Sequence, residues 1–289
     1  MVRYTKSHGL GNDYLILESA DLDFSLTPAR IRRICNRHTG VGSDGILLAE
    51  PGVDADAGLR ILNPDGSEAE KSGNGLRIFA RWLWDEKRVT THNPSISIMG
   101  GAHRARAMIH VSEDGEIEIE VQMGPARFTP GAIPSTLPGP EIVDRTLVVL
   151  GQHLPVTTVN VGNPHYVHFT HNVDSFPLET LGPAIERHGH FPQRTNVQVV
   201  QILDDSNLKI RIWERGAGIT QASGSSACAA AAAASRRLKR SGRFKVHMPG
   251  GILTVHVGEG DKLVQCGPAS PVVRGEFTAE FIAALKALD

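Results

Sequence analysis

Apolar residues along the chain recur with two different periods, and the shorter period predicts strands. Runs that are β-branched, or that alternate apolar with polar residues, and that Gly, Pro or Asn often bounds are typical of strands. Such runs lie at residues 14–18, 46–49, 96–99, 117–121, 157–161, 197–202, 209–213 and 253–257. Eight strands spread over the whole length indicate a protein with a large proportion of sheet.

The longer period predicts helices. Leu76, Phe79, Ala80 and Leu83 recur at i, i+3, i+4 and i+7, which marks one buried helical face. Residues 226–238 are mostly alanine, the best helix former, and so narrow a helix suits enclosure by a sheet. A further helix is expected over residues 27–36, where Pro28 occupies the first turn. Residues 128–140 are rich in Pro and Gly and are expected to connect two halves.

The chain contains an internal repeat, which predicts a duplicated fold. Arg60 precedes Ser72 by the same interval by which Arg211 precedes Ser223, and the two serines are 151 residues apart (223 − 72 = 151). The pair Gly11-Asn12 recurs at the same offset as Gly162-Asn163, and the Gly-Gly pair at 100–101 recurs at 250–251. Several matches in one order at nearly one offset favour duplication over coincidence.

Each repeat delivers a strand, a loop and then Ser-Gly at the start of a helix. The first N–H groups of a helix have no partner inside the helix, and the helix dipole adds partial positive charge there. Gly73 and Gly224 let the backbone approach a ligand closely. Both helix starts therefore indicate anion pockets, and pseudo-twofold packing would let them share one carboxylate. The alternative is that Ser72 and Ser223 are N-caps and nothing more.

Composition and charge narrow the class of protein. The chain has 289 residues, of which 40% are hydrophobic and 21% are charged. These proportions are those of a globular protein. A net charge of −1 without a basic stripe argues against a nucleic-acid partner. No secretory signal and no membrane-spanning run is evident, and Cys35, Cys228 and Cys266 have no metal-ligand spacing. We therefore expect a cytoplasmic protein with no metal, no membrane partner and no nucleic-acid partner.

Seven blocks of sequence, in order, resemble the diaminopimelate epimerase family. They are HGLGNDY at 8–14, NRHTGVGSDG at 36–45, NPDGSEAEKSGNG at 63–75, GNPH at 162–165, RTNV at 194–197, ERG at 214–216 and QASGSSAC at 221–228. The resemblance implies an α/β (α+β) fold with two pseudo-symmetric domains, each a curved mixed sheet or barrel around a central helix. It implies a first domain of residues 1–125 plus 269–289, a second of residues 126–268, and an active-site cleft between them. It also implies a homodimer.

The resemblance further implies a cofactor-free epimerase with a small-molecule amino-acid substrate, which interconverts LL- and meso-diaminopimelate in lysine biosynthesis. A base on one face removes the α-proton and an acid on the other returns one. The family's substrate-binding positions match residues of this chain throughout the blocks. They are Asn12, Asn63, Gly73, Asn74, Asn163, Asn196, Glu214, Arg215, Gly224 and Ser225.

The chain departs from the family at both catalytic positions, where Ser72 and Ser223 replace cysteines. A thiol titrates near pH 8.5, whereas a serine hydroxyl is a far weaker acid and needs a base beside it. Natural divergence and a deliberate double exchange would both give this pattern. His165 and Glu214 match positions beside the reacting centre, and either is a candidate base. Gly45 stands where some family members carry a polar side chain.

Three functions remain open on these residues. The first is diaminopimelate epimerase, with activity that is weak or removed by the two serines. The second is an isomerase or dehydratase of another amino acid that uses His165 or Glu214. The third is a non-catalytic amino-acid binder, because binding groups alone do not give rate.

Overall fold

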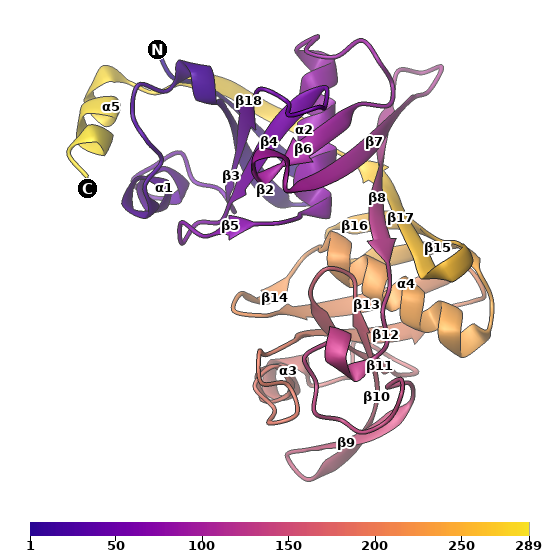
Figure 1. Ribbon diagram of the computed structural model, residues 1–289. Helices are drawn as coiled ribbons and strands as arrows, with labels where there is room; N and C mark the ends of the chain where they lie inside the picture. The colour runs from indigo at the N-terminus through magenta and orange to yellow at the C-terminus, as the bar shows by residue number, and fades with distance from the viewer. Residues whose placement is uncertain (289) are drawn as a thin grey trace. The chain divides into compact units, whose positions relative to one another are not determined.

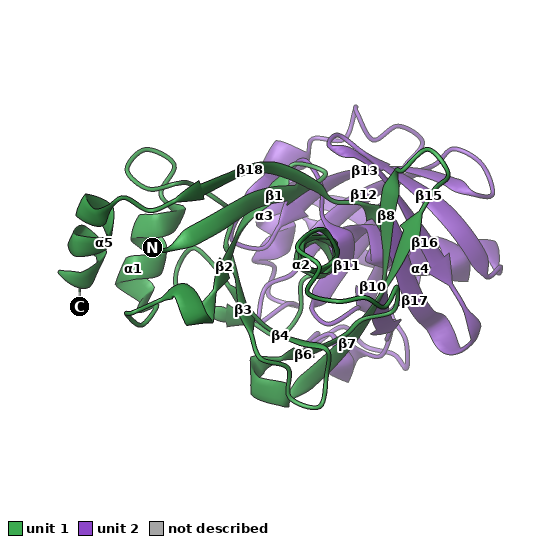
Figure 2. Cartoon of the chain, turned by 90° about the horizontal axis from the view of Figure 1, so that it is seen from above, with its two compact units in different colours: residues 1–121, 267–289 green, residues 122–266 purple. Residues whose placement is uncertain are grey.

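The computed structural model describes residues 1–288 and divides the chain into two compact units. Unit 1 comprises Met1–Val121 and Gly267–Asp289, and unit 2 comprises Gln122–Cys266 (Figure 2). The chain leaves unit 1 within one strand, β8, and returns to it at the end of another, β17. The C-terminal segment thus belongs to the unit that contains the N-terminus.

Unit 1 is a mixed sheet in which parallel and antiparallel pairs follow a fixed order. Its strands are β1 (Arg3–Gly9), β2 (Asn12–Glu18), β3 (Ile46–Glu50), β4 (Ala57–Leu62), β5 (Glu68–Ala69), β6 (Ser95–Ile98), β7 (His103–Val111), β8 (Ile117–Pro125) and β18 (Ser270–Glu276). β2 is parallel to β3, and β4 is parallel to β6. The pairs β18–β1, β1–β2, β3–β4, β6–β7 and β7–β8 are antiparallel, and β5 forms a hairpin with β4.

Unit 2 repeats this arrangement. Its strands are β9 (Arg145–Val149), β10 (Gln152–Asn160), β11 (Pro164–Phe169), β12 (Asn196–Ile202), β13 (Asn207–Glu214), β14 (Gly218–Thr220), β15 (Gly242–Met248), β16 (Gly251–Val257) and β17 (Lys262–Pro268). β11 is parallel to β12, and β13 is parallel to β15. β9–β10, β10–β11, β12–β13, β15–β16 and β16–β17 are antiparallel, with β14 as a hairpin on β13.

The two units are therefore pseudo-symmetric strand by strand. β1, β2, β3 and β4 correspond to β10, β11, β12 and β13, with the same sense of pairing at each step. The partner of the first strand differs in origin: β9 immediately precedes β10, whereas β18 comes from the C-terminal end of the chain. β18 thus pairs with β1 as β9 pairs with β10, although no strand precedes β1 among the described residues. The two similar units of mixed sheet and helix confirm the predicted fold class.

One helix lies inside each curved sheet. In unit 1, α2 (Gly73–Asp85) packs against β1, β2, β7 and β18, and it is seen end-on within the strands in Figure 2. In unit 2, α4 (Gly224–Leu238) packs against strands of its own unit, and its alanines from Ala227 to Ala234 are at most 1% exposed. Alanine side chains are small enough for strands to approach this helix from several sides at once, so apolar area is buried all around it.

Three shorter helices complete the fold: α1 (Pro28–Cys35), α3 (Leu178–Glu186) and α5 (Ala279–Lys286) (Figure 1). α1 matches the helix predicted over residues 27–36, and the Thr27 hydroxyl caps it by accepting from the backbone N–H of Arg30. The sequence analysis did not predict α3 or α5. Pro183 lies inside α3 and interrupts its helical signal, because proline donates no backbone hydrogen bond.

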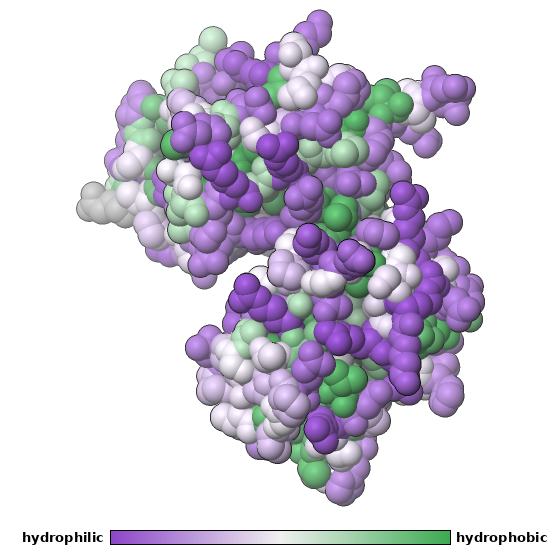
Figure 3. All heavy atoms as spheres, turned by 45° about the vertical axis from the view of Figure 1, so that its right-hand side comes forward, coloured by the Kyte–Doolittle hydropathy of each residue, from purple (hydrophilic) through white to green (hydrophobic). Residues whose placement is uncertain are grey.

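Each unit has its own apolar core. One cluster in unit 1 joins strands β2 and β3 to α1 and to Leu285 of α5, and one in unit 2 joins α3 to β10 and β12. Hydrophilic side chains cover most of the face seen in Figure 3, with scattered apolar spots. No helix within residues 1–288 is long and apolar enough to cross a membrane.

Candidate active site

One candidate helix start is that of α2 in unit 1. Ser72 has extended backbone angles (φ −138°, ψ 119°) and is the N-cap of the helix. Its Oγ accepts from the backbone N–H of Gly75 at 3.0 Å, so one of the unpaired N–H groups is satisfied. Gly73 and Asn74 follow as the first buried residues of the helix, where the dipole favours an anion.

A chain of polar side chains supports this helix start. Arg77 is fully buried and donates from Nη2 to Asn74 Oδ1 at 2.8 Å. Asn74 Nδ2 donates to Asn12 Oδ1 at 3.1 Å, and Asn12 Nδ2 donates to Asp44 Oδ2 at 3.0 Å. Asn12 and Asn74, both predicted substrate-binding residues, are thus hydrogen-bonded to one another.

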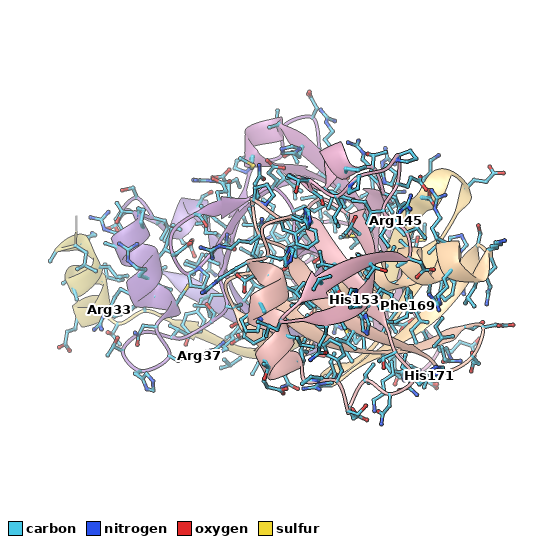
Figure 4. The ribbon with its side chains drawn as sticks, turned by 90° about the horizontal axis from the view of Figure 1, so that it is seen from below. Arg33, Arg37, Arg145, His153, Phe169 and His171 are labelled. Carbon is cyan, nitrogen blue, oxygen red and sulfur yellow. The ribbon has the colours of Figure 1, made fainter. Side chains whose placement is uncertain are left out.

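The far end of this chain is a cluster of charges. Arg37, labelled in Figure 4, lies in the loop after α1 and bonds Asp13 Oδ1 and Asp44 Oδ1 at 2.7 Å each. Lys6 Nζ lies 3.0 Å from Asp13 Oδ2. Burial raises the pKa of Asp13, but hydrogen bonds and charge from Arg37 and Lys6 outweigh burial and bring it down to about 2. Asp13 therefore stays ionised at neutral pH, and the cluster fixes the strand that carries Asn12.

Tyr14, which the sequence analysis did not single out for the site, contacts the candidate catalytic serine. It lies on β2, is 6% exposed, and places its Oη 3.3 Å from Ser72 Oγ. Gly45 gives the ring its space, because a Cβ there would lie 2.7 Å from Tyr14 Cε1 and 2.7 Å from the carbonyl oxygen of Leu62. The repeat could have revealed this residue, since Tyr14 and His165 are separated by the same 151 positions as the two serines (165 − 14 = 151).

The other candidate helix start is that of α4 in unit 2. Ser223 is the N-cap, with angles (φ −149°, ψ 124°) close to those of Ser72. Its Oγ accepts from the backbone N–H of Ser226 at 3.4 Å and lies 3.3 Å from Ser225 Oγ. Gly224 is buried behind it. Both serines are therefore caps, as the simpler interpretation held, and both present a hydroxyl at a helix N-terminus.

His165 is fully buried on β11, beside this second helix start. Its Nε2 lies 2.7 Å from Asn163 Oδ1 and its Nδ1 lies 3.1 Å from Gln198 Oε1. Gln198 Nε2 in turn donates to Ser226 Oγ at 3.0 Å. Burial lowers the pKa of His165 to about 3, and the charge of Arg215 adds to this. A neutral ring with both nitrogens engaged orients Asn163 and is poorly suited to act as a base.

The remaining predicted residues of unit 2 gather at the ends of β12 and β13. Asn196 Nδ2 donates to the Pro164 carbonyl at 2.9 Å, and its Oδ1 accepts from the Arg215 backbone N–H at 2.9 Å. Arg215 donates from Nη1 to the Gln193 carbonyl at 3.0 Å. Glu214 Oε1 accepts from the Thr220 hydroxyl at 2.9 Å. These bonds fix the carboxylate of Glu214 and the exposed guanidinium of Arg215, which follow one another at the end of β13.

Asn63 lies in unit 1, in the turn between β4 and β5. Its Nδ2 donates to Ser67 Oγ at 2.9 Å, and its backbone N–H donates to the Ser67 carbonyl. The turn lies in the segment that leads into Ser72. Within residues 1–288, no group of three or more His, Cys, Asp or Glu side chains is arranged to hold a metal ion.

Solved structures with this fold include a probable proline racemase, a hydroxyproline epimerase and a methylitaconate isomerase. A phenazine biosynthesis protein of the PhzF family from Bacillus anthracis matches with a TM-score of 0.69 at 17% identity, over 96% of this chain and 99% of that one. A probable proline racemase from Agrobacterium radiobacter matches with a TM-score of 0.69 at 14% identity, over 96% and 93% of the two chains. At these identities the likeness defines the two-unit fold.

Sequence relatives define the family. The sequence profile of diaminopimelate epimerase matches residues 4–129 and 157–272. The diaminopimelate epimerase of Ectopseudomonas mendocina is 40% identical over 279 residues, which cover 96% of this chain and 99% of that protein. Diaminopimelate epimerase 1 of Nostoc sp. is 38% identical over 96% of this chain and 99% of its own length. The chain belongs to the diaminopimelate epimerase family.

Proposed function

We propose that this protein binds diaminopimelate and epimerises it at one α-carbon, without a cofactor. The observation that carries the proposal is the pair of serine-capped helix starts with nearly equal backbone angles, one in each unit of a family member. Each start offers buried glycine and N–H groups to a carboxylate. Ser72 and Ser223 would serve opposite faces of the substrate's α-carbon.

The polar residues of both units suit the rest of such a substrate. Diaminopimelate carries an amino group and a carboxylate at each end, so its distal end needs both a hydrogen-bond acceptor and a cation. Glu214 and Arg215 supply this pair, and Asn163 and Asn196 supply amide groups held in place by His165 and Pro164. Asn63 would serve the same end from unit 1.

Serine at both positions predicts slow turnover. General acid–base catalysis is most efficient when the pKa lies near the working pH, and a serine hydroxyl is far from it. Positioning and the two helix dipoles still act on the developing negative charge, so we expect a reduced rate and intact binding. The binding groups alone would also give a non-catalytic binder, which makes proton exchange the property to measure.

The test follows α-deuterium uptake by LL-diaminopimelate in D2O. The parent protein is compared with the Ser72→Cys, Ser223→Cys double variant, and Ser72→Ala, Ser223→Ala is the matched control. We expect slow exchange in the parent, exchange faster by about 100-fold or more in the cysteine variant, and none in the alanine variant. Exchange in the cysteine variant alone would indicate an epimerase disarmed by its two serines, and binding without exchange in both the parent and the cysteine variant would support the amino-acid binder. No binding in any of them would reject the substrate.

We further propose that the protein works in the cytoplasm as a homodimer. Val272 and Val273 on β18, a strand of unit 1, are 57% and 47% exposed. We assign these two side chains to the edge of the proposed interface. Sedimentation equilibrium of the parent beside Val272→Lys tests this, and equal monomeric masses for both would contradict it.

A further inference from the structure

We propose that Tyr14 is the residue through which Ser72 exchanges its proton, so that a tyrosine–serine couple serves one face of the substrate. This inference rests on the proposed epimerase function. Tyr14 acts through Ser72 and does not itself touch the substrate, so it is a positioning residue. The couple is built entirely within unit 1, from β2 and the start of α2.

The serine oxygen can accept two hydrogen bonds, and the backbone of α2 uses one of these two acceptor positions of Ser72 Oγ. The Gly75 N–H occupies one lone pair of Oγ at 3.0 Å. Tyr14 Oη lies 3.3 Å from Oγ and is placed either to donate to it or to accept from it. A phenol, like a serine hydroxyl, can do both. When the phenol donates, Oγ accepts from both Gly75 and Tyr14, and the serine's own proton is left for a third partner, which we assign to the substrate.

The surroundings of Tyr14 hold its ring in this place. The residue is 6% exposed, and the neighbouring Asp13 is fixed by Arg37 and Lys6. The contact with Gly45 is so close that any side chain there would displace the ring or the backbone of Leu62. Gly45 therefore gives the aromatic ring its space, and the position of the ring in turn sets where the hydroxyl lies.

The other serine has no equivalent partner among the described residues of the repeat. His165 occupies the position that corresponds to Tyr14, but its two nitrogens engage Asn163 and Gln198. The hydroxyl beside Ser223 belongs to Ser225, at 3.3 Å, and is as weak an acid as Ser223 itself. The couple thus distinguishes the two faces, and removing it affects one face only.

The proton steps balance as follows. In one direction the phenol O–H bond breaks and its proton passes to Ser72 Oγ, while the serine's own proton passes to the α-carbanion and forms the Cα–H bond. Tyr14 is left as phenolate, and Ser72 ends as a neutral hydroxyl. In the reverse direction Ser72 Oγ takes the α-proton as its own proton passes to the phenolate. A phenol titrates near pH 10, far closer to neutrality than a serine hydroxyl.

The test is Tyr14→Phe, which removes the hydroxyl and keeps the ring. Tyr166→Phe is the matched control, because it removes another buried tyrosine hydroxyl, one with no hydrogen-bond partner within the described chain. We expect Tyr14→Phe to lower kcat by about 100-fold with KM within about two-fold of the parent, and the control to leave both unchanged.

The discriminating measurement is the primary deuterium isotope effect with α-deuterated LL- and meso-diaminopimelate. Because Tyr14→Phe cannot change the equilibrium constant between the LL and meso isomers, kcat/KM must fall by the same factor in both directions of the reaction. Only for the isomer whose α-proton Ser72 removes does proton abstraction become more rate-limiting. We therefore expect the isotope effect to rise for one isomer alone. In a Ser72→Cys background the loss caused by Tyr14→Phe should shrink to about ten-fold or less, because a thiol titrates near neutrality unaided.

Unchanged kcat in Tyr14→Phe would overturn the inference and leave the proposed function standing. So would isotope effects that rise equally for both isomers, or an undiminished loss in the Ser72→Cys background. A parent protein that binds the substrate without any exchange would overturn both proposals. Thermal unfolding of every variant separates these outcomes from simple loss of the fold.

Discussion

The two helix starts that carry Ser72 and Ser223 have nearly the same backbone angles but differ in the residues that support them. At α2 the support is polar: the buried Arg77 holds Asn74, which holds Asn12 and the Asp44 cluster. At α4 it is mostly apolar: beyond the neutral hydrogen bonds of His165, Gln198 and Ser226 at its start, eight consecutive residues, Ala227 to Ala234, seven of them alanine, are almost completely buried against strands. Duplication thus preserved the shape of the site and left its means of stabilisation free to diverge.

The difference is sharpest at one matched position. Arg77 and Cys228 stand at the same place in the two helices, since they are separated by the same offset as the serines (228 − 77 = 151). A buried guanidinium must keep its hydrogen bonds, because an unpaired buried charge is costly. A buried thiol behaves as a small apolar group and makes no such demand.

Arg77→Ala is expected to give the largest effect, a loss of about 3 kcal/mol of unfolding free energy. The change empties the volume of a fully buried side chain and leaves Asn74 Oδ1 without its donor. Cys228→Ala is the matched change in unit 2 and should cost about 1 kcal/mol. Urea denaturation of both variants measures the difference, and equal losses would contradict the contrast between polar and apolar support.

His165 makes unit 2 sensitive to mild acid. Its folded pKa of about 3 lies below its ordinary value of 6.5, so the unfolded state binds more protons between these values. Its stabilising effect is complete above pH 6.5 and is lost as the pH falls towards 3. We expect the parent to lose about 2 kcal/mol between pH 6.5 and 4.5 through this group, and His165→Gln to lack that slope. Urea denaturation at several pH values measures it.

Asp13 makes unit 1 sensitive only to stronger acid. Its pKa, held at about 2 by Arg37 and Lys6 despite burial, lies below its ordinary value of 3.8. The stability it contributes is present above pH 4 and is lost as the pH falls towards 2. Asp13→Asn should abolish a loss of about 1.5 kcal/mol of unfolding free energy between pH 4 and pH 2. It should leave unchanged the loss that His165 causes in milder acid. Urea denaturation over the same pH range measures it, and a change in the slope above pH 5 would contradict this separation.

Removal of the two N-cap hydroxyls is expected to give the smallest losses of stability, and the two losses should be similar in size. Ser72→Ala should cost about 1 kcal/mol and Ser223→Ala less. The reason is that their Oγ to N–H distances are 3.0 and 3.4 Å. Ser72→Ala also removes the partner of Tyr14. Thermal unfolding of the two single variants compares them directly, and a larger loss for Ser223→Ala would reverse the order.

Much of the fold could be predicted because its signals are local. All eight strand runs fall in or directly beside observed strands, and α1, α2 and α4 begin close to their predicted starts. α3 was missed because Pro183 breaks its pattern, and α5 because its residues carried no recognised signal. The end of the strand predicted at 96–99 also differs: Met99 has a positive φ of 51° and begins a short 3-10 turn.

Sequence alone determined the repeat, the two serine-headed helix starts and the family, since each is written in residue identity and spacing. Only the tertiary structure decided what surrounds each serine. Residues 14 and 72, like 165 and 198, are distant in the chain and meet only through the folding of the sheets, and a hydroxyl contact depends on small differences in position. Burial, which makes His165 neutral and gives Tyr14 its fixed place, likewise exists only once the chain has folded.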